Sequence, residues 1–542
     1  MCPDRLTGQP VVSQPVVPQP IVDDIPDFTS IPALVARHAR THPDKPAVTC
    51  DGIVRSWGAF DGRINKVARR LSEMGLGRGD KIAILAANSI EYLETFMGGL
   101  RAGVCVVPLS TMAAADALEK MLDDCDAKVL VLSDQYRALV EPYEARLGKL
   151  VAAGRIAYDF TRPGWQGFEA WLASASDAPF ETAIEPLDDF NIIYSSGTTG
   201  LPKGILHSHA LRSQLPVRFP AFDYGPDTIS LVSTPLYSNT TLVALLATVG
   251  VGGTSILMRK SDVVKFLELA QAERVTHAML VPVQYQRILA HPDFDKYDLG
   301  SFKAKLSTSA PLRAQVKADC LKRWPGRLIE IYGLTEGGGS CMLEANLYPD
   351  KLHTVGKAGF GVELKILDEQ GRELPQGEVG EIAGRAEMMM KGYYKQDDKT
   401  RELFWYDADG RLFFKSGDMG KLDEDGFLIL LDRKKDMIIS GGFNVYAADI
   451  EVLLLKHPDV IDAAVIGVPS EQWGESPMAL CVRRDGAATG EETVREWANG
   501  QLSKTQRLVA VEFRDSLPRS TIGKIMKREL RAPYWEGRTA KI

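Results

Sequence analysis

Short, largely apolar runs of strand length alternate with longer amphipathic segments from about residue 29 onward. The first runs lie at residues 81–85, 104–109 and 128–132. Apolar runs of this length are typical of strands that are buried on both faces. Residues 61–74 and 113–123 instead repeat apolar side chains at the three- and four-residue spacing of a helix with one buried side. This alternation predicts an α/β body with largely parallel sheets.

The same alternation returns after residue 190 and predicts a second, similar sheet unit. Five strand-length runs recur there, separated by helical segments such as residues 263–273; the runs are residues 191–194, 228–233, 254–257, 277–281 and 328–332. Residues 228–258 carry no charged side chain and are long enough to cross a bilayer. Because Pro235, Asn239 and three glycines interrupt this stretch, we expect a strand, a loop, a helix, a glycine turn and a strand instead.

The remaining regions differ in composition and predict further units. Beyond about residue 350, many glycines separate short β-like runs, which is typical of a small β-rich subdomain. A four-charge cluster at residues 432–435 then precedes a strand-like run and Gly441-Gly442. We therefore expect a large N-terminal domain over residues 26–431, a hinge at 432–435 and a small α+β C-terminal domain over 436–542. Residues 1–25 contain five prolines and little to bury, so they predict a flexible or surface-laid extension.

The amino-acid composition excludes or disfavours several classes of protein. The chain has 542 residues, of which 45% are hydrophobic and 25% charged, so neither a disordered protein nor a single small binding module fits. The 64 basic and 71 acidic residues give a net charge of −7, which disfavours binding to nucleic acid or anionic lipid. Seven scattered cysteines without a Cys-x-x-Cys pair indicate reduced thiols. With no secretory signal pattern at the N-terminus, we expect a cytoplasmic protein.

The densest chemical signal follows directly after the apolar strand predicted at residues 191–194. It reads Tyr194-Ser195-Ser196-Gly197-Thr198-Thr199-Gly200-Leu201-Pro202-Lys203-Gly204. Small residues let backbone N–H groups approach an anion, while hydroxyl groups and a lysine add donors and charge, as polyphosphate binding requires. Pro202 stands where a P-loop NTPase has glycine before its lysine, which disfavours a kinase or GTPase.

At this string the chain resembles the adenylate-forming superfamily of acyl-CoA synthetases, luciferases and peptide-synthetase adenylation domains. Further matches follow in the family's order over nearly the whole chain: Ser309-Ala310-Pro311, Tyr332-Gly333-Leu334-Thr335-Glu336, Gly392-Tyr393, Ser416-Gly417-Asp418, Asp432-Arg433-Lys434-Lys435, Gly441-Gly442 and the Pro518–Lys524 element. Ordered agreement at seven elements is far more specific than one match. The resemblance implies an AMP-binding N-terminal domain and a mobile C-terminal domain.

The resemblance also implies a role for each matched residue. Tyr332 would flank the adenine, Thr335 would contact phosphate, and Glu336 would help to hold Mg²⁺. Asp418 would bind the ribose hydroxyls, and Arg433 would lie near the ribose and phosphate. The implied ATP and AMP ligands are Ser195, Ser196, Gly197, Thr198, Thr199, Gly200, Lys203, Ser309, Ala310, Pro311, Tyr332, Gly333, Asp418 and Arg433. Ser309 stands where the family more often has glycine.

Four C-terminal residues carry the implied catalytic cycle. Lys524 would bridge the carboxylate and the α-phosphate and stabilise negative charge during attack. Lys435 would be the hinge residue about which the C-terminal domain swings. After the swing, Gly441 and Gly442 would border the tunnel for the pantetheine arm of CoA.

The implied chemistry has two steps and uses ATP, Mg²⁺ and CoA. A carboxylic acid attacks ATP to give acyl-AMP and pyrophosphate, and a thiol then displaces AMP. We therefore interpret the chain as an AMP-forming acyl-CoA synthetase. Two adenylating alternatives stay open: loading of a carrier-protein phosphopantetheine and luciferase-like oxidation. A third is a catalytically silent nucleotide-binding scaffold, which Lys524, Glu336 and Asp418 argue against.

The acid pocket is expected around Tyr237, Ser238 and Asn239. Ser238 stands where many relatives have histidine, and residues 235–248 lack the aspartate that amino-acid-activating domains usually place there. We expect a largely apolar fatty, aryl or arylalkanoic acid, as in fatty acid metabolism. A homodimer is the default expectation for the assembly. The flexible stretch before Lys524 raises the further hypothesis that a lysine acyltransferase modifies it and blocks adenylation.

Overall fold

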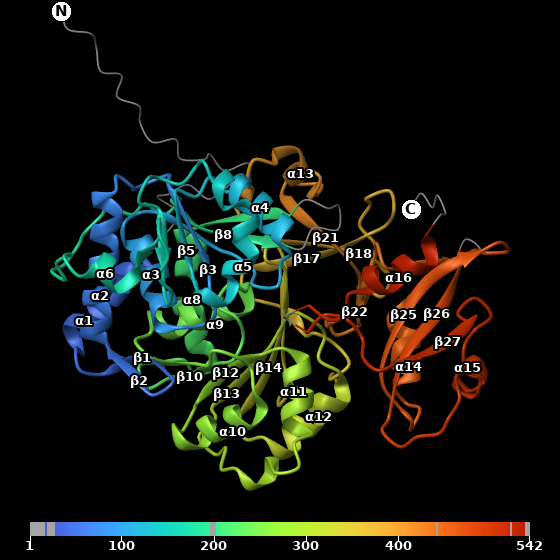
Figure 1. Ribbon diagram of the computed structural model, residues 1–542. Coiled ribbons are helices and arrows are strands. Elements are labelled where there is room, and N and C mark those ends of the chain that lie inside the picture. The colour runs from blue at the N-terminus through green and yellow to red at the C-terminus, as the bar shows by residue number, and fades with distance from the viewer. Residues whose placement is uncertain (1–16, 19–27, 196–201, 441–442, 521–522, 537–542) are drawn as a thin grey trace, which may run out of the picture.

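The computed structural model describes residues 17–18, 28–195, 202–440, 443–520 and 523–536. Figure 1 shows a large body and a smaller C-terminal lobe beside it. Two large sheets with helices around them form most of the body. The α/β class, the paired sheet units and the small β-rich subdomain that the sequence predicts are all confirmed.

The first large sheet has eight strands in the order β19-β9-β8-β4-β3-β5-β6-β7. The strands from β8 to β7 along this order are parallel, while β9 and β19 are antiparallel to their neighbours. Their bounds are β3 (Lys81–Leu85), β4 (Cys105–Pro108), β5 (Val129–Leu132), β6 (Arg155–Ala157), β7 (Gln166–Gly167), β8 (Asp189–Ser195), β9 (Lys203–Ser208) and β19 (Gly392–Tyr393).

The second large sheet has nine strands in the order β16-β15-β14-β13-β12-β10-β11-β1-β2. Its parallel centre runs from β14 to β1, with antiparallel strands at both ends. The bounds are β1 (Pro46–Cys50), β2 (Ile53–Ser56), β10 (Ile229–Val232), β11 (Thr254–Leu257), β12 (His277–Leu280), β13 (Ala304–Ser307), β14 (Arg327–Gly333), β15 (Ser340–Glu344) and β16 (Lys357–Ala358).

Helices between the two sheets give them a common core. Ile82 and Ile84 of β3 pack with these inner helices, whereas Ala83 and Leu85 face an outer layer. Both faces of the strand are therefore buried, as its continuous apolar sequence predicts. The inner helices are α1 (Ile31–Thr41), α2 (Trp57–Glu73), α3 (Ile90–Arg101) and α9 (Asn239–Gly250).

Other helices cover the outer faces of the two sheets. On the first sheet these are α4 (Ala115–Asp124) and α5 (Arg137–Val140), and on the second they are α10 (Val263–Ala272), α11 (Pro282–Leu289) and α12 (Ala314–Arg323). Trp324, fully buried after α12, contacts four aromatic rings of this layer. Short helices complete the body: α6 (Phe168–Leu172), α7 (His209–Ser213), α8 (Leu215–Arg218) and α13 (Asp397–Arg401).

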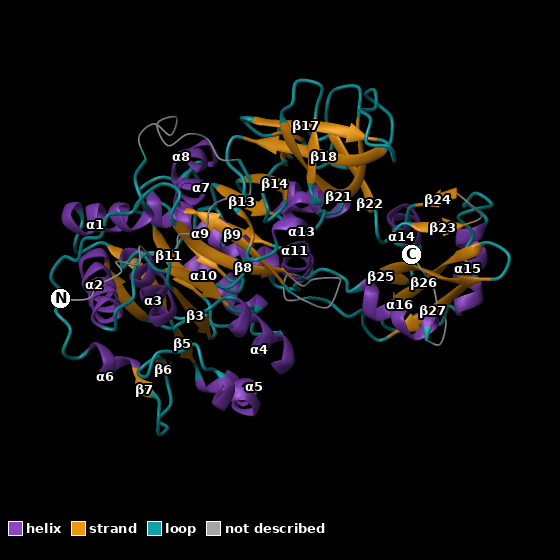
Figure 2. Ribbon diagram, turned by 90° about the horizontal axis from the view of Figure 1, so that it is seen from above, coloured by secondary structure: helices purple, strands orange, loops and turns teal. Residues whose placement is uncertain are grey.

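A small antiparallel sheet follows the second large sheet and projects from the body in Figure 2. It contains β17 (Val362–Leu367), β18 (Gly380–Ala386), β20 (Phe404–Tyr406), β21 (Leu412–Leu422) and β22 (Leu428–Arg433). β22 ends at Arg433 and the first strand of the C-terminal lobe begins at Ile438, so residues 434–437 connect the two parts. The predicted hinge at residues 432–435 overlaps the end of β22 and this connection.

The C-terminal lobe is a five-stranded sheet with helices, seen at the right of Figures 1 and 2. Its own apolar cluster joins the sheet to α14 and α15. The elements are β23 (Ile438–Ser440), β24 (Phe443–Val445), α14 (Ala447–Leu454), β25 (Val460–Ser470), β26 (Gly474–Arg483), α15 (Glu491–Asn499), β27 (Ala510–Arg514) and α16 (Lys527–Trp535).

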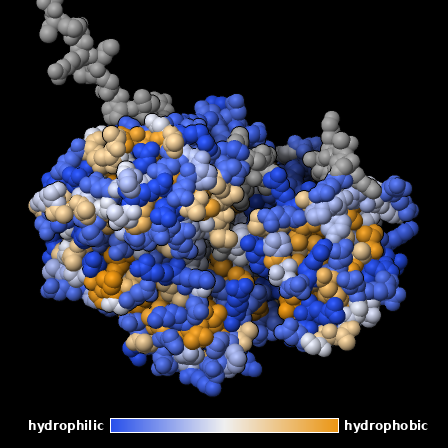
Figure 3. Space-filling view, viewed as in Figure 1, coloured by the Kyte–Doolittle hydropathy of each residue, from blue (hydrophilic) through white to orange (hydrophobic). Residues whose placement is uncertain are grey.

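Four features of the packing and the surface complete the description of the fold. Val17, in the predicted extension, is fully buried, and its N–H donates to the Lys391 carbonyl at 3.1 Å. His38 of α1 is half-buried, and its Nε2 lies 2.9 Å from the Gly250 carbonyl oxygen. The view in Figure 3 mixes hydrophilic and apolar areas. Within the described part of the chain, no helix is long and apolar enough to span a membrane.

Candidate active site

Two neighbouring parallel strands place the predicted adenine-binding segments side by side. β13 leads into Ser309-Ala310-Pro311, and β14 ends in the Tyr332–Glu336 motif. Because Ser307 pairs with Glu330 across the two strands, both segments leave the same edge of the sheet. Ligands of open α/β sheets gather at this carboxyl edge.

A three-residue polar cluster lies where the small sheet meets β14. Asp418 of β21 faces Arg433 of β22, with 3.0 Å between Asp418 Oδ1 and Arg433 Nε. Tyr332 donates its hydroxyl proton to Asp418 Oδ2 at 3.0 Å. Burial and the adjacent carboxylate raise the pKa of Tyr332, so its phenol stays a donor. These contacts fix the orientation of the Asp418 carboxylate that the resemblance assigns to the ribose.

Glu336 is anchored by β19, a contact that the sequence did not predict. The Tyr393 hydroxyl donates to Glu336 Oε1 at 2.8 Å, and the Met390 N–H donates to the Glu336 carbonyl at 3.0 Å. Tyr393 also lies under Lys203, whose Nζ is 4.8 Å from the ring centroid. The family match at Gly392-Tyr393 was the one feature of the sequence that pointed to this segment.

The described ends of the phosphate-binding string lie opposite each other. Ser195, the last residue of β8, pairs with Lys203, the first residue of β9. Lys203 therefore stands near Tyr393 and, through it, near Glu336. The predicted ligands Ser196, Gly197, Thr198, Thr199 and Gly200 lie outside the described residues.

Lys524 of the C-terminal lobe interacts electrostatically with the same polar cluster. Burial, followed by the nearby Arg433 cation, lowers the pKa of Lys524 to about 8, and Asp418 opposes this shift. These interactions place the amine in the electrostatic environment of the predicted ribose site. Lys524 is half-buried rather than exposed, so a modifying enzyme has less access to it in this arrangement than the acylation hypothesis assumed.

Direct contacts hold the Lys524 loop against the body. Asp462 of β25 pairs with Arg313, which precedes α12, and with Arg519 of the loop. Arg519 also donates to the Gly523 carbonyl at 2.7 Å. Gly523 has φ +73°, and a Cβ there would come within 2.5 Å of Val283 Cγ1 in α11. Glycine is therefore required here for both backbone conformation and close approach.

Lys435 lies in the connection between the body and the C-terminal lobe. Lys435 is exposed within residues 434–437. Gly441 and Gly442 lie outside the described residues. The hinge and tunnel roles of these positions stay predictions.

The predicted acid-pocket residues open α9. Tyr237 and Ser238 are buried, and Asn239 is the first residue of the helix. The next residue, Thr240, forms a short hydroxyl–hydroxyl hydrogen bond with Ser309. Ser309 has φ +78°, a conformation that favours glycine, and this position is one where the family more often has glycine. The acid segment and the adenine segment are thus in direct contact.

A buried network that the sequence did not assign lies behind these segments. Arg212 of α7 donates to Asn191 and Asn239 and is within 2.9 Å of His207, which contacts the Thr335 carbonyl. His209, at the family's usual histidine position, is fully buried and packs edge-on against Phe190. Burial lowers the pKa of His209 to about 3, so it is neutral. In the sequence, only their position just after the phosphate-binding string could have pointed to His207 and Arg212 as site residues.

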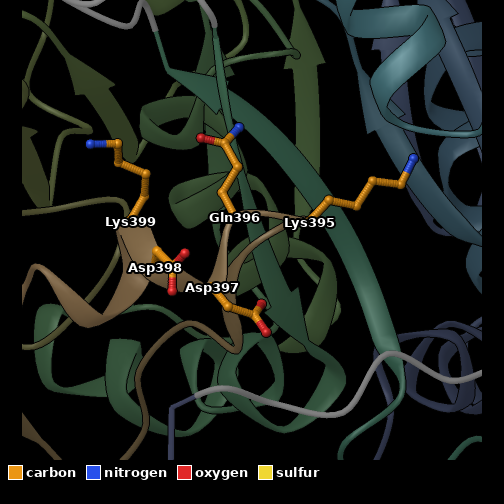
Figure 4. A pocket seen from close by; sticks show the side chains of 5 residues that line it. All are labelled: Lys395, Gln396, Asp397, Asp398 and Lys399. Atoms are coloured by element: carbon orange, nitrogen blue, oxygen red, sulfur yellow. The ribbon is translucent and has the colours of Figure 1, made fainter.

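A surface pocket lies next to Tyr393, whose carbonyl accepts the Gln396 N–H at 3.0 Å. It is lined by five consecutive residues, Lys395, Gln396, Asp397, Asp398 and Lys399. In Figure 4 the two lysine side chains point in opposite directions, and they pair with Asp126 and Glu402. The lining charges are thus engaged with neighbours and do not converge on one ligand.

Comparisons with known proteins agree with this geometry. A family model described as AMP-binding enzyme matches residues 35–394, and a model of the AMP-binding enzyme C-terminal domain matches residues 449–524. A fatty acid–[acyl-carrier-protein] ligase, ScoC, from Streptomyces coeruleorubidus is 30% identical over 95% of this chain and 99% of its own length. A feruloyl-CoA synthase from an Amycolatopsis species is 33% identical over 92% of this chain and 98% of its own.

A solved structure is similar over the same range. ATP-bound MatB from Rhodopseudomonas palustris superimposes with a TM-score of 0.83 at 31% identity, covering 94% of this chain and 99% of that protein. The similarity therefore extends through both the body and the C-terminal lobe.

Proposed function

The chain belongs to the AMP-binding enzyme family, and from this premise we propose that it is an AMP-forming acid–thiol ligase acting on a largely apolar carboxylic acid. In the first half-reaction it converts the acid and ATP into acyl-AMP and pyrophosphate. In the second it transfers the acyl group to CoA and releases AMP. The acid class, the thiol acceptor and the individual residue roles are the finer parts of this proposal.

The observation that carries the proposal is the docking of the Lys524 loop onto the body, which brings the lysine into the electrostatic field of the Asp418–Arg433 pair. A cation from one lobe interacts electrostatically with an oriented carboxylate from the other. A charge that stabilises a developing anion is effective when it is held in place before the reaction. A scaffold that only binds nucleotide has no need for this lysine, so the arrangement favours catalysis.

In the first half-reaction an oxygen of the substrate carboxylate attacks the α-phosphorus of ATP. A new P–O bond forms, the bond between the α-phosphorus and the bridging oxygen breaks, and pyrophosphate leaves. Lys524 would neutralise charge between the carboxylate and the α-phosphate, while Thr335 and Lys203 would contact phosphate oxygens. Tyr332 and Asp418 would hold adenine and ribose.

In the second half-reaction the thiol sulfur of CoA attacks the acyl carbon. The C–S bond forms, the bond from the acyl carbon to the phosphate oxygen breaks, AMP leaves, and the thiol proton passes to solvent. No nucleophile of the enzyme is needed. All six cysteines in the described residues are free and buried, which fits a packing role.

Glu336 provides an oxygen donor that fits Mg²⁺. Its carboxylate is half-buried and is oriented by the Tyr393 hydroxyl. Mg²⁺ prefers hard oxygen ligands and usually combines one or two carboxylates with substrate phosphates. Bound there, the ion would neutralise phosphate charge as pyrophosphate departs.

The acid class rests on the pocket and on the relatives. Tyr237, Ser238 and Asn239 open α9, whose next turns bury Leu242, Leu245 and Leu246 against the core. Relatives named feruloyl-CoA synthase and 4-coumarate–CoA ligase support an aryl or arylalkanoic acid, and the fatty acid–carrier-protein ligase supports a fatty acid. That last relative also supports a second candidate, in which a carrier-protein phosphopantetheine replaces CoA.

The cycle would require the C-terminal lobe to move between half-reactions. We infer that Lys435 serves as the hinge and that Gly441 and Gly442 border the thiol tunnel after the movement. Because Lys524 is half-buried here, its acylation by a lysine acyltransferase would occur mainly when the lobe is undocked.

Pyrophosphate release with Mg-ATP and a panel of fatty, aryl and arylalkanoic acids, with and without CoA, tests the proposal. We expect one acid class to support release, with turnover sustained only by CoA. Lys524→Ala should reduce adenylation about 100- to 1,000-fold. Adenylate formation that is indifferent to CoA would identify the carrier-protein candidate. No release with any acid would contradict the ligase.

A further inference from the structure

Arg212 is a buried cation that is held by two asparagines and a histidine. Its side chain is 4% exposed, and among the described residues no carboxylate forms an ion pair with it. Instead, Nε donates to Asn191 Oδ1 at 3.1 Å, and one terminal nitrogen donates to Asn239 Oδ1 at 2.9 Å. Burying a charge without an opposite charge is costly. A role in stability alone therefore does not account for an arginine here.

The third contact of Arg212 fixes the protonation of a buried histidine. Its terminal nitrogen lies 2.9 Å from Nδ1 of His207, and Nε2 of that ring lies 2.8 Å from the Thr335 carbonyl. Arginine has no acceptor, so His207 Nδ1 must accept and Nε2 must carry the proton. Burial and the arginine lower the pKa of His207 well below its usual value, which keeps the ring neutral.

The network spans three separate segments of the chain. Asn239 is the first residue of α9, in the proposed acid pocket, and Thr335 immediately precedes Glu336 in the proposed nucleotide site. Asn191 and His207 pair across β8 and β9, the strands that flank the phosphate-binding string. A single guanidinium thus connects the acid segment to the backbone that carries Glu336.

Resting on the proposed function, we propose that Arg212 and His207 are positioning residues that couple the acid pocket to the nucleotide site. Arg212 fixes the start of α9 through Asn239 and, through His207, fixes the Thr335 carbonyl. When the acid settles against α9, the same contacts hold Thr335 and Glu336 in place for ATP. Coupling of this kind is reciprocal, so ATP should tighten acid binding by the factor by which the acid tightens ATP binding.

Binding of a non-hydrolysable ATP analogue, measured by calorimetry with and without the acid identified above, tests the coupling. In the wild type we expect the acid to tighten analogue binding at least about fivefold. Arg212→Met and Asn239→Ala should each bring this factor close to one, and the double variant should resemble the single variants. Ser213→Ala, the next residue on α7, is the matched control, because its hydroxyl has no partner within the described residues.

Two conservative variants separate positioning from packing. His207→Gln places an amide donor near the Nε2 position and retains the bond to Thr335, whereas His207→Asn retains an acceptor for Arg212 and loses that bond. We expect His207→Gln to keep adenylation within about threefold and His207→Asn to raise the KM for ATP about tenfold or more. Thioester formation from isolated acyl-AMP should change little in either variant.

The outcomes distinguish failure of the inference from failure of the proposed function. A wild type that adenylates an acid but shows no coupling between acid and analogue overturns the inference and leaves the ligase intact. Equal losses in His207→Gln and His207→Asn, or equal losses in both half-reactions, also overturn it, since either result indicates a packing role only. A wild type that adenylates no acid contradicts the proposed function itself.

Discussion

Asp418 and Arg433 stand directly opposite each other on β21 and β22, with the carboxylate Oδ1 3.0 Å from the guanidinium Nε. The second carboxylate oxygen accepts the Tyr332 hydroxyl at 3.0 Å. Asp418 is only 8% exposed, so both of its oxygens are oriented before any ligand arrives. Such preorganisation reduces the entropy that nucleotide binding must overcome.

Asp418→Asn should weaken ATP binding while leaving the fold intact. The amide keeps the size of the side chain but loses the charge that attracts ribose hydroxyls and Arg433. Hydrogen bonds to a charged group contribute about 1.5–3 kcal/mol, so we expect the KM for ATP to rise roughly 10- to 100-fold. Initial rates of pyrophosphate release at varied ATP measure this. Asp409→Asn, an exposed position in the same subdomain, should match the wild type; an unchanged KM in Asp418→Asn would exclude the ribose role.

The pKa of Lys524 should lie well below that of an ordinary lysine when the lobe is docked. Partial burial lowers its pKa to about 8, so the amine is charged below that pH and neutral above it. Adenylation needs the cation, and we expect kcat/KM for ATP, which reports ionisations of the free enzyme, to fall as pH rises through about 8. Competitive acylation, read by mass spectrometry, should give a labelling midpoint near pH 8 that moves upward when Mg-ATP adds negative charge. A midpoint near 10.5 without ATP would mean that the lysine is solvated.

Much of the fold was predictable because local patterns determine it. The run at residues 254–257 coincides with β11, and the uncharged stretch at 228–258 forms a strand, a helix and a second strand, as its glycines and proline predict. The predicted site residues Tyr332, Asp418 and Arg433 come together in space.

The unpredicted parts of the site depend on contacts between distant segments. His207 contacts a carbonyl 128 positions away, and no local pattern distinguishes that histidine from the neighbouring His209, which only packs on Phe190. From the sequence, Arg212 resembles a surface charge on a short helix. It is buried in the structure because three separate segments pack around it. Tyr393 was matched, but its hydrogen bond to Glu336 follows from the pairing of β19 with β9.

The buried pair of Lys317 and Glu330 should support the adenine segment. Both side chains are almost fully buried, and Glu330 Oε1 accepts the Leu312 N–H, just after Pro311, at 2.6 Å. Glu330→Gln leaves the Lys317 cation uncompensated and should destabilise the protein by about 3 kcal/mol. Lys317→Met/Glu330→Gln removes both charges and should be more stable than the single variant Glu330→Gln. Denaturant midpoints measure these differences; a double variant less stable than Glu330→Gln would contradict the argument.

Asp462 should hold the Lys524 loop in its docked position against the body. Its carboxylate pairs at 3.3 Å with Arg313 of the body and, on its other oxygen, with Arg519, which also bonds the Gly523 carbonyl. Asp462→Asn weakens both pairs and should shift the lobe away from the docked arrangement. The three side chains are partly exposed, so each pair is worth only about 0.2–1 kcal/mol, and we expect a loss of adenylation of roughly two- to tenfold.

Rates of the two half-reactions distinguish a role of Asp462 in docking from a role in the stability of the lobe. Undocking withdraws Lys524 from Asp418 and Arg433 and should slow adenylation, whereas thioester formation from isolated acyl-AMP should be unchanged or faster, because the undocked population rises. High salt screens partly exposed pairs, so it should lower wild-type adenylation toward the rate of Asp462→Asn. Asp485→Asn, an exposed aspartate of the same lobe, is the control and should change neither step. Equal slowing of both half-reactions in Asp462→Asn would mean that the carboxylate stabilises the lobe rather than its docking.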